Sequence, residues 1–188
     1  IKLMGRSASH IALECALQTQ PNICLISEEI EAKQMTLDDV VNYIAEIVAA
    51  RAAKGNNFGT VLIPEGLIEF IPAMKRLIAE LNDYLAANGS EFAMIKKSEQ
   101  INYIIKHLSP ENSAIYASLP EGVARQLTLD RDPHGNVQVS LIETEKLLGE
   151  MVGRRLAEMK AEGKFVGKFA TQFHFFGYEG RCADPSNF

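Results

Sequence analysis

A carboxylate and two arginines in this sequence each lie beside glycine at the end of a short apolar run. Glu65 follows the apolar residues 61–63 and Pro64, and Gly66 comes directly after it. Short continuous apolar runs bounded by turn residues are typical of strands that are covered on both faces. We therefore expect Glu65 at the end of a buried strand, although an acid in the first turn of the following helix would also have a structural role.

The two arginines belong to short loops that contain glycine. Met4, Gly5 and Arg6 follow the apolar start of the chain, and the loop 177–181 (Gly-Tyr-Glu-Gly-Arg) follows an aromatic run and ends at Arg181. Arginine binds phosphate through two parallel hydrogen bonds from its N–H groups, and glycine lets the backbone approach a ligand closely. For either loop alone, a surface arginine beside a turn is the simpler interpretation.

The order of the expected elements brings these three loops together. The apolar runs that we expect to form strands are 1–3, 23–26, 58–63 and 165–176. Strands that alternate with helices through short connections indicate a parallel sheet, and ligands of such sheets bind outside the carboxyl ends of the strands. The arrangement suits a ligand with a phosphate for Arg6 and Arg181 and hydroxyl groups for Glu65.

The middle of the chain departs from this alternation. After Pro72, which either kinks a helix or starts a second one, helical patterns follow each other without a strand signal. We interpret residues 82–139 as a helical insertion into an α/β domain that comprises residues 1–81 and 140–188. The expected fold is a three-layer, Rossmann-like domain with a parallel sheet and this insertion.

Local signals predict some of the boundaries. Thr36 and Asp39 are spaced close to a capping box, and residues 140–143 (Ser-Leu-Ile-Glu) match that pattern, so a long helix is expected from 140 to Gly163. The charged turn 130–136 (Asp-Arg-Asp-Pro-His-Gly-Asn) is interpreted as a solvated corner.

Composition limits the classes of partner. The 188 residues are 47% hydrophobic with a net charge of −5, which indicates a globular protein without a global field for nucleic acid or an anionic membrane. No apolar run approaches the roughly 20 residues that span a bilayer. The three cysteines and four histidines lack metal-ligand spacing, which favours reduced thiols, a cytoplasmic location and no metal held by this chain.

Four stretches together resemble the long form of the pyrophosphate-dependent phosphofructokinases. They are Met4-Gly5-Arg6, Ile63-Pro64-Glu65-Gly66, the run 127–139 and the run 174–181. The likeness covers essentially the whole chain, and the ordered set is more specific than any single motif. It implies a phosphofructokinase-like fold and a reversible glycolytic reaction, in which pyrophosphate and Mg²⁺ phosphorylate O1 of fructose 6-phosphate to give fructose 1,6-bisphosphate.

The resemblance also implies roles for individual residues. The substrate-binding residues carried over by motif are Met4, Gly5, Arg6, Glu65, Tyr178, Glu179, Gly180 and Arg181. Arg6 would also stabilise the phosphoryl group in transfer, Glu65 would hold sugar hydroxyls, and Arg181 would bind the 6-phosphate. A homodimer or a higher oligomer is expected by the same analogy.

Parts of the family pattern have no counterpart in this sequence. They are the Gly-Gly-Asp donor loop, the Thr-Ile-Asp motif that supplies the catalytic base, and the acid that helps to hold Mg²⁺; in the family they precede the Met-Gly-Arg loop. We therefore expect a fragment that carries the fructose 6-phosphate site and is inactive alone. A non-catalytic regulatory subunit of the same family and an ATP-dependent phosphofructokinase stay open as alternatives.

Overall fold

The computed structural model of this chain describes residues 1–5, 8–96, 99–129, 131 and 136–176. The chain divides into two compact units, one formed by Ile1–Ile71 with Thr144–Phe188 and the other by Pro72–Glu143. Within the part of the chain that is described, none of the helices combines the length and the apolar character needed to cross a membrane.

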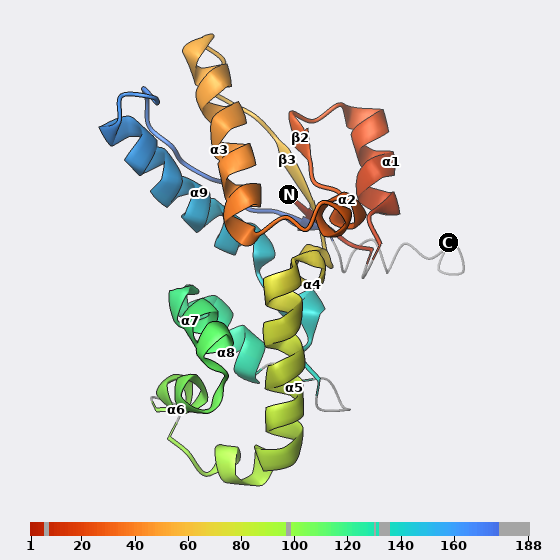
Figure 1. Cartoon of the computed structure of the whole chain (residues 1–188). Helices are drawn as coiled ribbons and strands as arrows, with labels where there is room; N and C mark the ends of the chain where they lie inside the picture. The colour runs from red at the N-terminus through yellow and green to blue at the C-terminus, as the bar shows by residue number, and fades with distance from the viewer. Residues whose placement is uncertain (6–7, 97–98, 130, 132–135, 177–188) are drawn as a thin grey trace, which may run out of the picture. The chain divides into compact units, whose positions relative to one another are not determined.

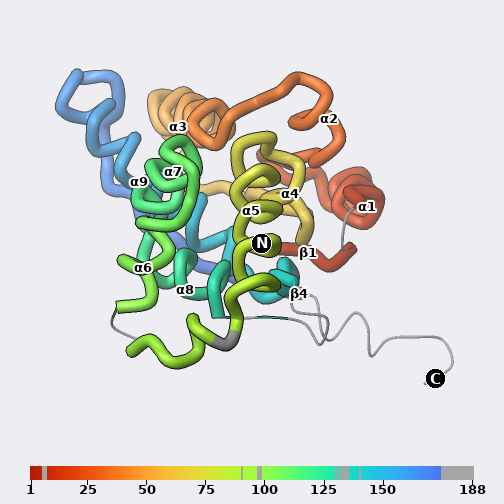
Figure 2. Tube along the Cα trace, turned by 60° about the horizontal axis from the view of Figure 1, so that its bottom comes forward, coloured from red at the N-terminus to blue at the C-terminus, as the bar shows by residue number. Residues whose placement is uncertain are grey.

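A parallel sheet of four short strands is the centre of the first unit. The strands are β1 (Lys2–Leu3), β2 (Ile23–Cys24), β3 (Val61–Pro64) and β4 (Phe175–Phe176). Their order is β2-β3-β1-β4, and each neighbouring pair is parallel. Figure 1 labels β2 and β3, and Figure 2 labels β1 and β4. The α/β class and the parallel sheet predicted from the sequence are confirmed.

Five helices connect or cover these strands. They are α1 (His10–Thr19), α2 (Ser27–Ala32), α3 (Leu37–Ala53), α4 (Leu67–Phe70) and α9 (Thr144–Ala161). Helix α1 packs against β2 and β3, and α3 packs along α9 (Figure 1). The capping signal at the start of α3 is confirmed, because the Asp39 amide donates to Thr36 Oγ1 and the Thr36 amide donates to the Asp39 carboxylate.

The second unit is helical. Its helices are α5 (Pro72–Ala93), α6 (Gln100–His107), α7 (Pro110–Ser118) and α8 (Glu121–Leu129). Helices α7 and α8 pack against α5, and α6 packs on α7 and α8 (Figure 1). Pro72 starts a second helix rather than kinking the first, because α4 ends at Phe70 and Ile71 has an extended backbone. The predicted insertion, 82–139, lies inside this unit.

Several predicted boundaries are wrong, and the strand expected at 23–26 ends at Cys24. The strand expected at 58–63 begins only at Val61. The strand expected at 165–176 is limited to Phe175–Phe176, which pair with Lys2 and Leu3 of β1. The long helix begins at Thr144 instead of 140, because Val139–Leu141 forms a 3₁₀ turn and the Glu143 amide donates to a side chain of α8.

Candidate functional site

Two of the three predicted loops meet at the carboxyl edge of the sheet. Leu3 pairs with Pro64, so the chain leaves β1 and β3 side by side. The amide of Gly5 donates a hydrogen bond to Glu65 Oε2 at 3.2 Å. Glu65 is only 2% exposed. Buried carboxylates need hydrogen-bond donors, so this contact fixes the acid at the edge where parallel sheets bind ligands.

Gly5 has a backbone that other residues avoid. Its φ is +142°, and a Cβ at this position would lie 2.9 Å from the carbonyl oxygen of Ala8. The Ala8 amide donates to the Gly5 carbonyl at 3.1 Å, which closes a turn between β1 and α1. Glycine is therefore required for the turn that aims its own N–H at Glu65.

A second connection behind this turn was missed by the sequence analysis. The Ser27 amide donates to Ser9 Oγ at 2.8 Å, and the Ser9 amide donates to Glu28 Oε1 at 3.0 Å. Ser9 and Ser27 are both buried. Ser9 has the position and residue type of an N-cap of α1, yet its hydroxyl makes no capping bond and joins α1 to the start of α2 instead.

Hydrogen bonds around this connection also affect the acidity of Glu28. Burial opposes ionisation of the carboxyl group, but the amide and hydroxyl of Ser9 and the backbone amide of Glu28 itself favour the carboxylate. The net effect is that the pKa of Glu28 lies below its ordinary value. A serine directly before a helix and an acid at the start of the next one were the only sequence signals for this pair.

The third predicted loop follows β4. That strand pairs with β1 and ends at Phe176, opposite Leu3. The predicted binding residues that lie outside the described residues are Arg6, Tyr178, Glu179, Gly180 and Arg181. The structure therefore places the ends of the strands that precede these residues in the sequence. The contacts and roles of the residues themselves stay predictions.

A buried ion pair lies on β1, close to the turn at Gly5. Lys2 Nζ is 3.6 Å from Glu145 Oε2 of α9, and the two side chains are 2% and 7% exposed. A buried lysine requires a charged or hydrogen-bonding partner. The pair therefore specifies how α9 lies on the sheet. A lysine inside an apolar run was the sequence signal, and it was overlooked.

The described residues contain no group of three or more histidine, cysteine, aspartate or glutamate side chains that could hold a metal ion. The prediction that the metal is bound mainly by preceding parts of a longer protein stays a prediction.

Curated relatives match the whole chain. It is 69% identical over 188 residues to pyrophosphate–fructose 6-phosphate 1-phosphotransferase of Porphyromonas gingivalis, and 57% identical over 189 residues to the protein of that name in Treponema pallidum (strain Nichols). It is 52% identical over 188 residues to the beta subunit of the Solanum tuberosum protein. Each match includes 100% of this chain and 32–34% of the relative.

The chain thus spans about a third of the length of these relatives. No family model matches the sequence. The resemblance inferred from the four motifs is nevertheless confirmed, because the identity extends from the first residue to the last.

Proposed function

We propose that this chain, which is related over its whole length to pyrophosphate-dependent phosphofructokinases, is the part of such an enzyme that binds fructose 6-phosphate. The complete protein would use pyrophosphate and Mg²⁺ to phosphorylate O1 of the sugar phosphate, reversibly, and so produce fructose 1,6-bisphosphate. The single observation that supports this assignment most is the hydrogen bond from Gly5 to the buried Glu65 at the carboxyl edge of the sheet.

Glu65 is suited to hold sugar hydroxyl groups. A carboxylate accepts hydrogen bonds only, so it complements the O–H donors of a sugar and repels a phosphate. The Gly5 amide holds one of its oxygens in place, which reduces the cost of ordering the acid when the sugar binds. Arg6 and Arg181, which lie outside the described residues, are proposed as the groups that bind the phosphoryl and 6-phosphate groups.

Positioning and electrostatic stabilisation are most of what phosphoryl transfer requires of a protein. The residues of this chain would bind and orient the acceptor sugar. Met4, Tyr178, Glu179 and Gly180 are proposed to complete that pocket. The catalytic base, the donor loop and the Mg²⁺ ligands would come from the rest of the parent protein, which is proposed to be a cytoplasmic homo-oligomer.

We also infer a three-layer arrangement for the first unit. Successive strand residues direct their side chains to opposite faces of a sheet. Leu3 packs with Ala12 of α1, whereas Lys2 pairs with Glu145 of α9. These contacts support helices on both faces. Residues 82–139 are proposed as a helical insertion between the parts 1–81 and 140–188.

The test is an assay of the full-length parent protein. Fructose 6-phosphate and Mg²⁺ are supplied with either pyrophosphate or ATP as the only donor, and fructose 1,6-bisphosphate is measured. Turnover with pyrophosphate alone is the expected result. Turnover with ATP alone would keep the acceptor site and contradict the donor, and binding of fructose 6-phosphate without turnover would indicate a regulatory subunit instead.

A further inference from the structure

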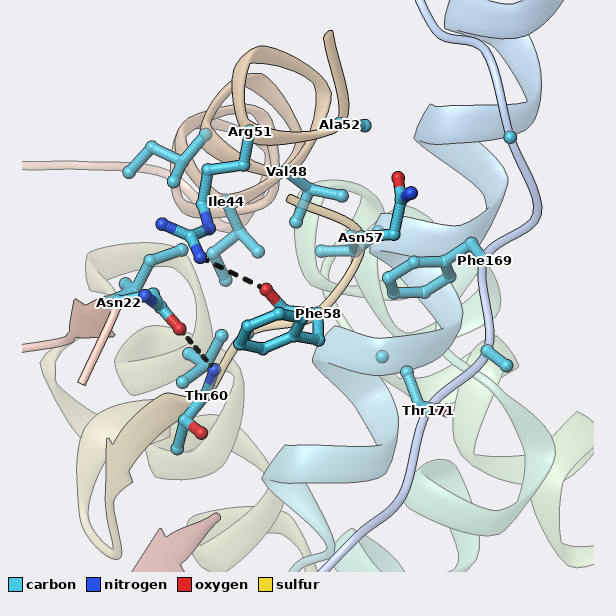
Figure 3. Close-up of a pocket in the computed structure, with 18 of the residues that line it drawn as sticks. Asn22, Ile44, Val48, Arg51, Ala52, Asn57, Phe58, Thr60, Phe169 and Thr171 are labelled. Carbon is cyan, nitrogen blue, oxygen red and sulfur yellow. Dashed lines mark hydrogen bonds between the residues drawn. The ribbon is translucent and has the colours of Figure 1, made fainter. Parts of the chain in front are cut away.

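A cavity of about 860 Å³ lies in the first unit, at the amino-terminal edge of the sheet (Figure 3). Its walls come from α3, from α9, from residues 56–60 before β3 and from residues 165–173 before β4. Asn22, which precedes β2, and Ile1, which precedes β1, also line it. The cavity is thus at the end of the sheet opposite to Gly5 and Glu65.

The rim of this cavity carries exposed aromatic side chains. Phe58 is 80% exposed and Phe173 is 38% exposed. The loop that carries Phe58 is nevertheless held in place, because Arg51 donates to the Phe58 carbonyl at 3.2 Å and the Thr60 amide donates to Asn22 Oδ1 at 2.8 Å (Figure 3). A fixed apolar surface of this kind is expected to have a partner.

The hydrogen bonds of β3 indicate that the partner is an extended backbone. The Ile1 nitrogen donates to the Val61 carbonyl at 2.7 Å, and the Ile63 amide donates to the Ile1 carbonyl at 2.9 Å. Thr60 faces the opposite edge of the strand, because its carbonyl accepts hydrogen bonds from the amides of Asn22 and Ile23 at the start of β2. Since neighbouring strand residues direct their backbone groups to opposite edges, the Gly59 carbonyl and the Val61 amide are directed at the space before Ile1.

The segment before β4 borders the same space. The Lys2 amide donates to the His174 carbonyl at 2.8 Å. A Cβ on Gly149 of α9 would lie 2.6 Å from the side chain of Phe173 and 3.6 Å from that of Thr171. The side chains of these alternate residues therefore pack against α9. The backbone therefore alternates as an extended strand does, and by the same alternation Gln172 directs its backbone groups at the space before Ile1.

We propose that this cavity is the slot for the residues that immediately precede Ile1 in the parent protein. They would continue β1 toward its amino end, between residues 59–61 and 170–174. The chain is 34% of the length of its Porphyromonas gingivalis relative, and the family resemblance implies that further parts of the parent protein precede the Met4-Gly5-Arg6 loop. The slot would be the same whichever phosphoryl donor the enzyme uses.

The register of β1 specifies the contacts of this extension. The residue directly before Ile1 donates its amide to the Gln172 carbonyl, and the residue before that one accepts from the Val61 amide. The residue directly before Ile1 is two positions from Lys2, so its side chain enters the cavity from the same face. An apolar side chain is expected there, because Ile44, Val48 and Leu148 line the cavity.

Hydrogen exchange on the full-length parent protein tests the proposal at single-residue resolution. The amides of Val61 and Gln172 are expected to exchange at least ~10-fold more slowly than in an unfolded chain, at every protein concentration and without any ligand. Unprotected amides would overturn the proposal. So would protection that appears only at high protein concentration, which would assign the slot to a second copy, or only with a small molecule bound.

A pair of cysteines provides an independent test. The residue directly before Ile1 is changed to cysteine together with Phe173→Cys, which the register places opposite it on the same face. Neighbouring strands lie about 4.8 Å apart, within the Cα separation of a disulfide. Mild oxidation is expected to join this pair within one chain, and not the control pair with Gln172→Cys, whose side chain points to the other face. Joining of the control pair alone would overturn the register.

Discussion

Gly5 and Glu65 are sixty residues apart in the sequence, and the amide of the first donates to Oε2 of the second at 3.2 Å. The bond joins the loops that follow β1 and β3, two neighbouring strands of a parallel sheet. Neither loop can move alone without leaving the buried carboxylate short of a donor, which costs roughly 1–3 kcal/mol. The proposed sugar site therefore has one side that is ordered before the ligand arrives.

Gly5→Ala is expected to disrupt this side of the site. The φ of +142° and the approach of a new Cβ to within 2.9 Å of the Ala8 carbonyl would force the turn to shift, at a cost of about 1–3 kcal/mol. The Michaelis constant for fructose 6-phosphate in the parent enzyme should rise about 10-fold or more. Gly122→Ala is the matched control, because nothing lies within 4 Å of its added Cβ. Equal kinetics for both variants would contradict the requirement for glycine.

Glu65→Gln separates charge from shape at the same site. The glutamine oxygen can still accept from the Gly5 amide, so the turn should persist, but the charged acceptor proposed for the sugar hydroxyls is lost. Hydrogen bonds to charged groups contribute about 1.5–3 kcal/mol, so the Michaelis constant for fructose 6-phosphate should rise roughly 10- to 100-fold. Glu121→Gln, on an exposed side chain of α8, should leave it unchanged. An unaltered constant in Glu65→Gln would remove this acid from the site.

The sequence predicted the site best where a local pattern and the topology agreed. The apolar run before Glu65 and the short run before Met4 form neighbouring parallel strands, and strand order alone was enough to place their loops together. The same reasoning placed β4 beside the other edge of β1.

Contacts between distant polar side chains could not be predicted in this way. The pairing of Lys2 with Glu145 and of Ser9 with Ser27 depends on how helices lie on the sheet, which periodicity does not specify. The turn at 130–136 shows a similar limit. It was interpreted as solvated, but Arg131 is half-buried and donates to Asn82 Oδ1 of α5 at 2.6 Å.

Lys2→Met is expected to destabilise the protein strongly. Glu145 would be left buried without its cation, and breaking a buried pair typically costs about 3–5 kcal/mol. The double variant Lys2→Met with Glu145→Leu should recover much of this loss, because apolar replacement of a whole pair is often neutral. Urea titrations of the parent protein measure both effects. Lys33→Met breaks an exposed pair with Glu29 and should change stability by less than about 1 kcal/mol; a similar small loss in Lys2→Met would refute a structural role for the buried pair.

Ser9→Ala tests the connection between α1 and α2. The variant removes the acceptor of the buried Ser27 amide, which should cost about 1–3 kcal/mol in the free energy of unfolding. Ser9→Thr keeps a hydroxyl group and should lose less. If both variants had the same free energy of unfolding as the native protein, the hydrogen bond at 2.8 Å would contribute nothing to stability.

Glu28→Gln should make stability depend less on pH in the acid range. Hydrogen bonds from Ser9 hold the pKa of Glu28 below its ordinary value of 4.5. A carboxyl group with a lowered pKa stabilises the folded protein fully above the ordinary value, and that contribution is lost as pH falls through the lowered pKa. The native protein should therefore exceed the variant in thermal midpoint at pH 6 to 7, with a difference that shrinks below about 4.5. A difference that stays constant down to pH 3 would show that the charge of Glu28 is not responsible, and would leave only a change in packing at the start of α2.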